Sequence, residues 1–111
     1  MRPGQLTPNE LEAEVLGVIA KTDQALEQAV DQLHVLSRTY TGVGSFTTFA
    51  CSSDEPQRDI SLGKHIQIPG LSHGLGAVLF LKGNEPCTLE IYAYGENWDG
   101  TIEGYALKDA A

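Results

Sequence analysis

The fold is decided by the stretch LSHGLGAVLFLKGNEPCTLEIYAYGENW, residues 71–98. Two runs rich in β-forming residues, 76–82 and 88–94, flank a short polar segment, as in a β-hairpin. A four-residue loop over 83–86 then sets the pairing of the two strands, because opposed residues in an antiparallel pair point to the same side. This register predicts one wholly apolar face, with the pairs Val78–Ile91 and Phe80–Leu89 in the core.

The opposite face of this hairpin has a mixed character. It is expected to carry apolar and aromatic residues around two polar ones: Leu75, Ala77, Leu79, Leu81, Tyr92 and Tyr94 around Thr88 and Glu90. Two helices are too few to cover both faces of the sheet, so the C-terminal segment, a second subunit or a ligand is expected on this one. An exposed apolar patch of this kind usually marks an interaction site.

The N-terminal third of the chain predicts two helices. Thr7 is expected to cap the first, with Pro8 at the first helical position and Glu10 closing a capping box. A break near residues 21–23 is expected, because Thr22 and Asp23 are good caps and poor helix-interior residues. The expected buried residues of the two helices are Leu11, Val15, Val18, Ile19, Leu26, Val30 and Leu33. One long helix is the alternative.

The remaining chain reads as strands and loops. Strands are predicted over 35–40, 45–50, 64–68 and 101–107, with polar loops over 51–59 and 95–100. Helices followed by strands indicate an α+β fold: two N-terminal helices packed on one face of a mainly antiparallel four- to six-stranded sheet. The 111 residues are expected to form a single domain, 1–111.

The composition excludes several classes of function. The net charge is −8, from 7 basic and 15 acidic side chains, so there are few cations to neutralise phosphates of nucleic acid or anionic lipid. No apolar run is long enough to span a bilayer, and the first twelve residues lack the apolar stretch of a signal peptide, which predicts a cytoplasmic location. Cys51 and Cys87 lie in no metal-binding motif, and two reduced structural thiols are expected.

No motif in the sequence specifies a reaction. The fragments GVG at 42–44 and GLG at 74–76 complete no phosphate-binding loop, and the three histidines match no zinc spacing. No catalytic residue, metal ligand or cofactor is therefore predicted. The candidate binding residues are polar or aromatic groups on the predicted strands and nearby loops: Arg38, Tyr40, His73, Glu90, Tyr92, Tyr94 and Trp98.

Three segments resemble those of a family of small uncharacterised bacterial proteins. They are TGVGSFTTF at 41–49, GLSHGLGAVLF at 70–80 and LEIYAYGENW at 89–98. The chain departs from the family at Ser45, where relatives carry an aromatic residue, and at Asp99, where they carry proline. The resemblance covers most of residues 6–107 and implies a short helical N-terminus before a β-rich body. It implies no activity.

These patterns favour a non-enzymatic protein-interaction module, with self-association as one form of it. The binding surface would be the face that carries Leu79, Glu90, Tyr92 and Tyr94. An acidic antidote to a basic toxin is a variant that rests on charge alone. The alternative is a small ligand-binding protein or enzyme with a site around Arg38, His73, Glu90 and Trp98, and a metal protein is a third possibility.

Overall fold

The computed structural model describes residues 7–31 and 33–109. Within these ranges two helices precede a seven-stranded sheet, in which every pairing is antiparallel. The helices are α1 (Glu10–Ala20) and α2 (Gln24–Val30). The strands are β1 (Val35–Tyr40), β2 (Gly44–Phe49), β3 (Gln57–Ser61), β4 (Lys64–Gln67), β5 (Leu75–Lys82), β6 (Glu85–Ala93) and β7 (Ala106–Asp109).

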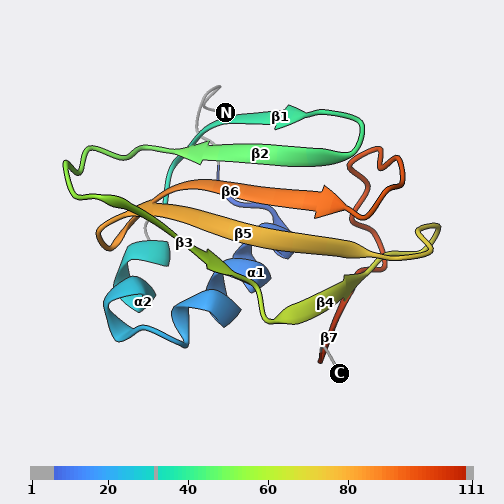
Figure 1. Cartoon of the computed structure of the whole chain (residues 1–111), viewed down its shortest axis with the longest axis horizontal. Helices are drawn as coiled ribbons and strands as arrows, with labels where there is room; N and C mark the ends of the chain where they lie inside the picture. Colours follow the sequence, from blue (N-terminus) through green and yellow to red (C-terminus); the bar gives the residue numbers. More distant parts are fainter. Residues whose placement is uncertain (1–6, 32, 110–111) are drawn as a thin grey trace.

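The sheet has the strand order β1-β2-β6-β5-β4-β7, and β3 also pairs with β5. Both helices lie on the same side of it (Figure 1), which gives a two-layer slab of 38 × 37 × 22 Å. The core fills the space between the layers, and includes Leu11, Val15 and Ile19 of α1 against Leu79 and Leu89 of the sheet. The α+β architecture with two N-terminal helices is therefore confirmed. No helix among the described residues has the length and apolar character needed to cross a bilayer.

The first helix begins at Glu10, two residues later than the sequence suggests. Asn9, not Thr7, is the N-cap: its side chain accepts a hydrogen bond from the Glu12 amide, and Glu12 accepts one from the Asn9 amide, both at 2.8 Å. This reciprocal pair is a complete capping box, which Thr7 and Glu10 do not form. The break between the helices is confirmed, with Asp23 capping α2 through the amide of Ala25. In α1, Leu16 is buried and Val18 only partly so.

The predicted register of the β5–β6 hairpin is wrong by one residue. Leu79 pairs with Leu89 and Ala77 with Ile91, while Val78 pairs with Glu90. The connection is a two-residue turn, Gly83-Asn84, with Lys82 opposite Glu85. Gly83 has a φ of +62°, the conformation that glycine adopts at the first central position of a type II′ turn.

A bulge in the hairpin then shifts the register once more. Phe80 pairs with Thr88 and Leu81 with Pro86, so Cys87 is the extra residue on β6. The alternation of β5 is consequently the reverse of the prediction: Leu75, Leu79 and Leu81 are fully buried, and Val78 and Phe80 are half-buried on the other side. The predicted core positions Leu89 and Ile91 of β6 are confirmed.

Two other elements differ from the sequence-based expectation. Strand β3 begins at Gln57, inside the predicted loop 51–59, because this segment pairs with the free edge of β5 from Lys82 to Val78. The last strand starts only at Ala106, after an irregular segment with a turn at residues 103–104. There Tyr105 donates a hydrogen bond to Glu14 of α1 at 2.7 Å, which ties the C-terminal segment to the helix layer.

Candidate binding face

The side of the sheet that faces away from the helices is called here the open face. Two cross-strand rows run across its centre, Phe46–Glu90–Val78 and Thr48–Thr88–Phe80. The open face comprises Phe46 and Thr48 of β2, Val78 and Phe80 of β5, Thr88, Glu90 and Tyr92 of β6, and Tyr94 just after β6. Phe46 is 40% exposed and Tyr94 is 47% exposed, so large aromatic rings remain in contact with solvent.

Three of the sequence-predicted residues lie together on this face: Glu90, Tyr92 and Tyr94. The rings of Tyr92 and Tyr94 meet edge to face at 5.4 Å, and His65 of β4 stacks on Tyr94 at 6.5 Å. Burial raises the pKa of the Tyr92 phenol, and the neighbouring Tyr94 and Glu90 raise it further. Gly76 makes room for this cluster, because a Cβ there would lie 2.7 Å from the ring of Tyr92.

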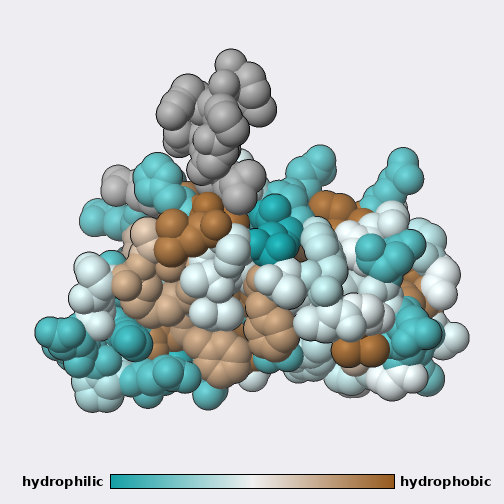
Figure 2. All heavy atoms as spheres, turned by 90° about the horizontal axis from the view of Figure 1, so that it is seen from above, coloured by the Kyte–Doolittle hydropathy of each residue, from teal (hydrophilic) through white to brown (hydrophobic). Residues whose placement is uncertain are grey.

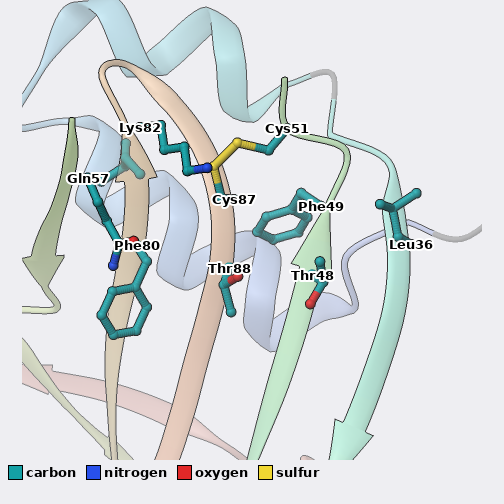
Figure 3. Close-up of a pocket in the computed structure, with 10 residues that line it drawn as sticks. Leu36, Thr48, Phe49, Cys51, Gln57, Phe80, Lys82, Cys87 and Thr88 are labelled. Atoms are coloured by element: carbon teal, nitrogen blue, oxygen red, sulfur yellow. A yellow bond between two sulfur atoms is a disulfide. The ribbon is translucent and has the colours of Figure 1, made fainter. Parts of the chain in front are cut away.

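A groove of about 530 Å³ crosses one end of the open face (Figure 3). Its walls come from five strands, with Leu36 on β1, Thr48 on β2, Gln57 on β3, Phe80 on β5 and Thr88 on β6. Leu36 is 62% exposed beside it. Seen from the β1 edge, apolar surface gathers over the half of the molecule where β1 begins and β2 ends (Figure 2).

The two cysteines close one end of this groove as a disulfide. Cys51 and Cys87 are bonded, with their Cα atoms 5.2 Å apart, within the range that disulfides require. The expectation of two reduced thiols is therefore wrong. The bulge at Cys87 and the end of β2 bring the residues together across adjacent strands, although they are 36 positions apart in the sequence.

Arg38 lies on the helix side of the sheet, away from the open face. Its guanidinium donates two hydrogen bonds to Glu12, at 2.5 and 2.8 Å, and Thr47 donates another to the same carboxylate at 2.6 Å. Burial raises the pKa of Glu12, but the hydrogen bonds from Arg38, Thr47 and Asn9 outweigh it and leave this pKa below its ordinary value. The guanidinium is 18% exposed and its role is to hold α1 on the sheet.

The other predicted residues lie in separate places. Trp98 is 4% exposed and belongs to the core, where its indole donates a hydrogen bond to the Thr101 carbonyl at 2.9 Å. Tyr40 lies edge-on to Trp98 at 6.3 Å. His73 is exposed in the loop before β5, where its amide donates to Glu96. The structure therefore does not bring Arg38, His73, Glu90 and Trp98 into one site.

The residues that sequence reasoning missed are Leu36, Phe46, Val78 and Phe80. Val78 and Phe80 were assigned to the core because the register was taken from a four-residue loop. The signal that identifies them is the Gly83-Asn84 pair, since Gly-Asn between two strand-like runs is typical of a two-residue hairpin turn. Phe46 follows from the alternation of β2, in which Ser45 and Thr47 are buried on either side of it.

The open face is mainly apolar and aromatic. Aromatic rings and aliphatic side chains dominate it, and Glu90 is the carboxylate at its centre. No group of three or more potential metal ligands occurs among residues 7–31 and 33–109. Comparisons with family models, with curated proteins and with solved structures gave no match to this chain. The family resemblance of residues 41–98 thus stays a prediction.

Proposed function

We propose that this chain is a non-enzymatic interaction module and that its open face binds another protein. The observation that carries this proposal is the asymmetry of the sheet. One side is sealed by α1 and α2, while the other presents Phe46 and Tyr94, each at least 40% exposed. Contiguous exposed apolar surface is rare on proteins that act alone, and aromatic residues are favoured at the centre of interfaces.

A catalytic or small-ligand function has less support. It required Arg38, His73, Glu90 and Trp98 to converge, but Arg38 and Trp98 are engaged on the helix side and Glu90 lies on the open face. The groove beside Phe80 is open to solvent and is lined by both apolar and polar side chains, and it lies on the same face. It therefore supports contact with a protein surface more than chemistry on a small substrate.

Photo-crosslinking tests the proposal directly. A benzophenone amino acid replaces Phe46 on the open face, and in a matched control it replaces Ala13, which is exposed on α1. We expect irradiation of cells of the source organism to give a discrete protein adduct from position 46 and none from position 13. Adducts from position 13 alone, or from neither position, would contradict the proposal.

The cytoplasmic location stays a prediction, and the disulfide counts against it. Disulfides persist mainly in oxidising compartments, and the reducing agents of the cytosol keep most thiols free. Both Cys51 and Cys87 are partly exposed beside the groove, so a reductant can reach them. Alkylation of intact cells with a membrane-permeant maleimide tests whether the disulfide is present in the cell, since Cys51 and Cys87 are labelled only when they are reduced. Labelling of both would favour the cytosol.

A further inference from the structure

We propose that the occupant of the open face is a second copy of this chain, packed sheet against sheet around a two-fold axis. This inference rests on the proposed function and names its partner. Two antiparallel sheets commonly pack face to face at about 10 Å, with the side chains of both inner faces interdigitating. The open face has the composition, the charge and the size that such a pairing needs.

The distribution of charge favours self-association despite the net charge of −8. The outward positions of the strands carry Asp59, Glu85 and Glu90 against Lys82 and Lys108, a net charge of only −1. The acidic excess lies elsewhere: residues 7–31, which form the helix layer, contain six carboxylates and one lysine. In a face-to-face dimer the two helix layers lie on opposite outer surfaces, separated by far more than the Debye length of about 8 Å. Their repulsion is then largely screened.

The size of the open face matches a modest interface. Five strands (β1, β2, β6, β5 and β3) spaced about 4.8 Å apart and about 20–25 Å long give roughly 500–600 Å² before side-chain relief is counted. A stable interface buries about 600–1,000 Å² on each partner. A second copy that covers the whole face therefore only reaches the lower limit of this range, which predicts a weak, reversible dimer.

The shape of the open face suits contact with the same face of a second copy of the chain. Phe46 is 40% exposed on it, and the groove of about 530 Å³, with Leu36 in its wall, is a hollow on the same side (Figure 3). A two-fold axis places the same ridge and hollow on both partners, so each copy offers projections to the hollow of the other. Glu90, in the middle of the face, limits the affinity because two carboxylates lose water when the faces meet.

The test is sedimentation equilibrium of the full chain from about 1 µM to about 1 mM, the range of modest affinities. We expect a monomer–dimer equilibrium with a dimer of twice the 11.9 kDa chain mass. Phe46→Lys should weaken the dimer at least tenfold, whereas Ala13→Lys, which adds the same charge to the helix layer, should leave it unchanged. Glu90→Gln should tighten the dimer, and Glu103→Gln on an exposed loop should not. Tyr94→Lys replaces Phe46→Lys if that variant does not fold.

The outcomes separate this inference from the proposed function. A monomer throughout the concentration range, together with an adduct of position 46 to a different protein, overturns the second copy and keeps the interaction module. A monomer without any adduct overturns both. A dimer that Phe46→Lys and Tyr94→Lys leave intact, with each variant folded by circular dichroism, places the interface elsewhere and also overturns the inference.

Discussion

Glu12 is the residue that joins the two layers of the molecule. Its carboxylate is 1% exposed and accepts hydrogen bonds from Asn9, Arg38 and Thr47, so it caps α1 and fixes the helix to β1 and β2 at the same time. A buried carboxylate is tolerated because it is fully paired. The same arrangement explains why Arg38, although it looks like an interface residue in the sequence, serves the fold.

Removal of the Arg38 guanidinium should show how far the fold depends on the pairing of Glu12. Arg38→Met leaves Glu12 buried without its ion-pair partner, which should lower the free energy of unfolding by about 3 kcal/mol. Lys64→Met removes an exposed pair with Asp109 at 2.7 Å and should cost much less, because solvent screens an exposed pair. Urea denaturation of both variants at neutral pH measures the difference. Equal losses would show that Glu12 does not depend on Arg38.

The contribution of the Glu12–Arg38 pair to stability depends on pH, because folding lowers the pKa of Glu12. The pKa of Glu12 is lower in the folded chain than its ordinary value of 4.5, so the folded state binds fewer protons than the unfolded state near that pH. Its stabilisation is therefore complete above pH 4.5 and is lost as the pH falls through the folded pKa. The stability gap between the wild type and Arg38→Met should narrow over this acidic window.

At the scale of elements, local chemistry made the helices predictable. The break at Thr22-Asp23 and the strands β1, β2 and β4 follow from caps and β-forming runs in the sequence. The register of β5 and β6 did not follow, because one residue of slip exchanges the two sides of a strand and both alternatives placed apolar residues together. The turn at Gly83-Asn84 and the bulge at Cys87 decide between them.

The same limit applies to the open face. Glu90, Tyr92 and Tyr94 lie on it as predicted because β6 keeps its predicted sides, whereas Val78 and Phe80 were expected in the core because the sides of β5 are reversed. The sequence predicts Trp98 as a binding residue, but tertiary packing buries it in the core. The Cys51–Cys87 bond also required the sheet, since β2 and β6 are neighbours only in three dimensions.

Alanine substitutions at two glycines, Gly44 of β2 and Gly17 of α1, should change the stability of the fold in opposite directions. Gly44→Ala would place a Cβ 2.5 Å from the backbone oxygen of Ile91, a group that cannot move aside, and should destabilise the fold by about 1–3 kcal/mol. A Cβ at Gly17 of α1 meets nothing within 4 Å, so Gly17→Ala should stabilise it by about 0.5–1 kcal/mol. Thermal unfolding of both variants measures the two changes in stability. A neutral Gly44→Ala would contradict the close approach of β2 and β6.

At the scale of the whole molecule, the chain is polarised between an acidic helix layer and a nearly neutral aromatic sheet surface. Residues 7–31 supply the acidic layer, and β2, β5 and β6 supply the aromatic one. This polarity allows a chain with a net charge of −8 to meet its own copy while the repelling charges stay on the outside. The second layer that the open face lacks is, in this account, supplied by association.

An isotope-filtered NOE experiment on a mixture of labelled and unlabelled chain is the sharpest test of the sheet-to-sheet dimer, because it detects only contacts between copies. We expect intermolecular signals from Phe46, Val78 and Tyr94 on the open face, and none from Ala13 or Glu14 on α1. Intermolecular signals confined to the helix layer or to the β1 edge, or none at concentrations near 1 mM where modest dimers form, would contradict it.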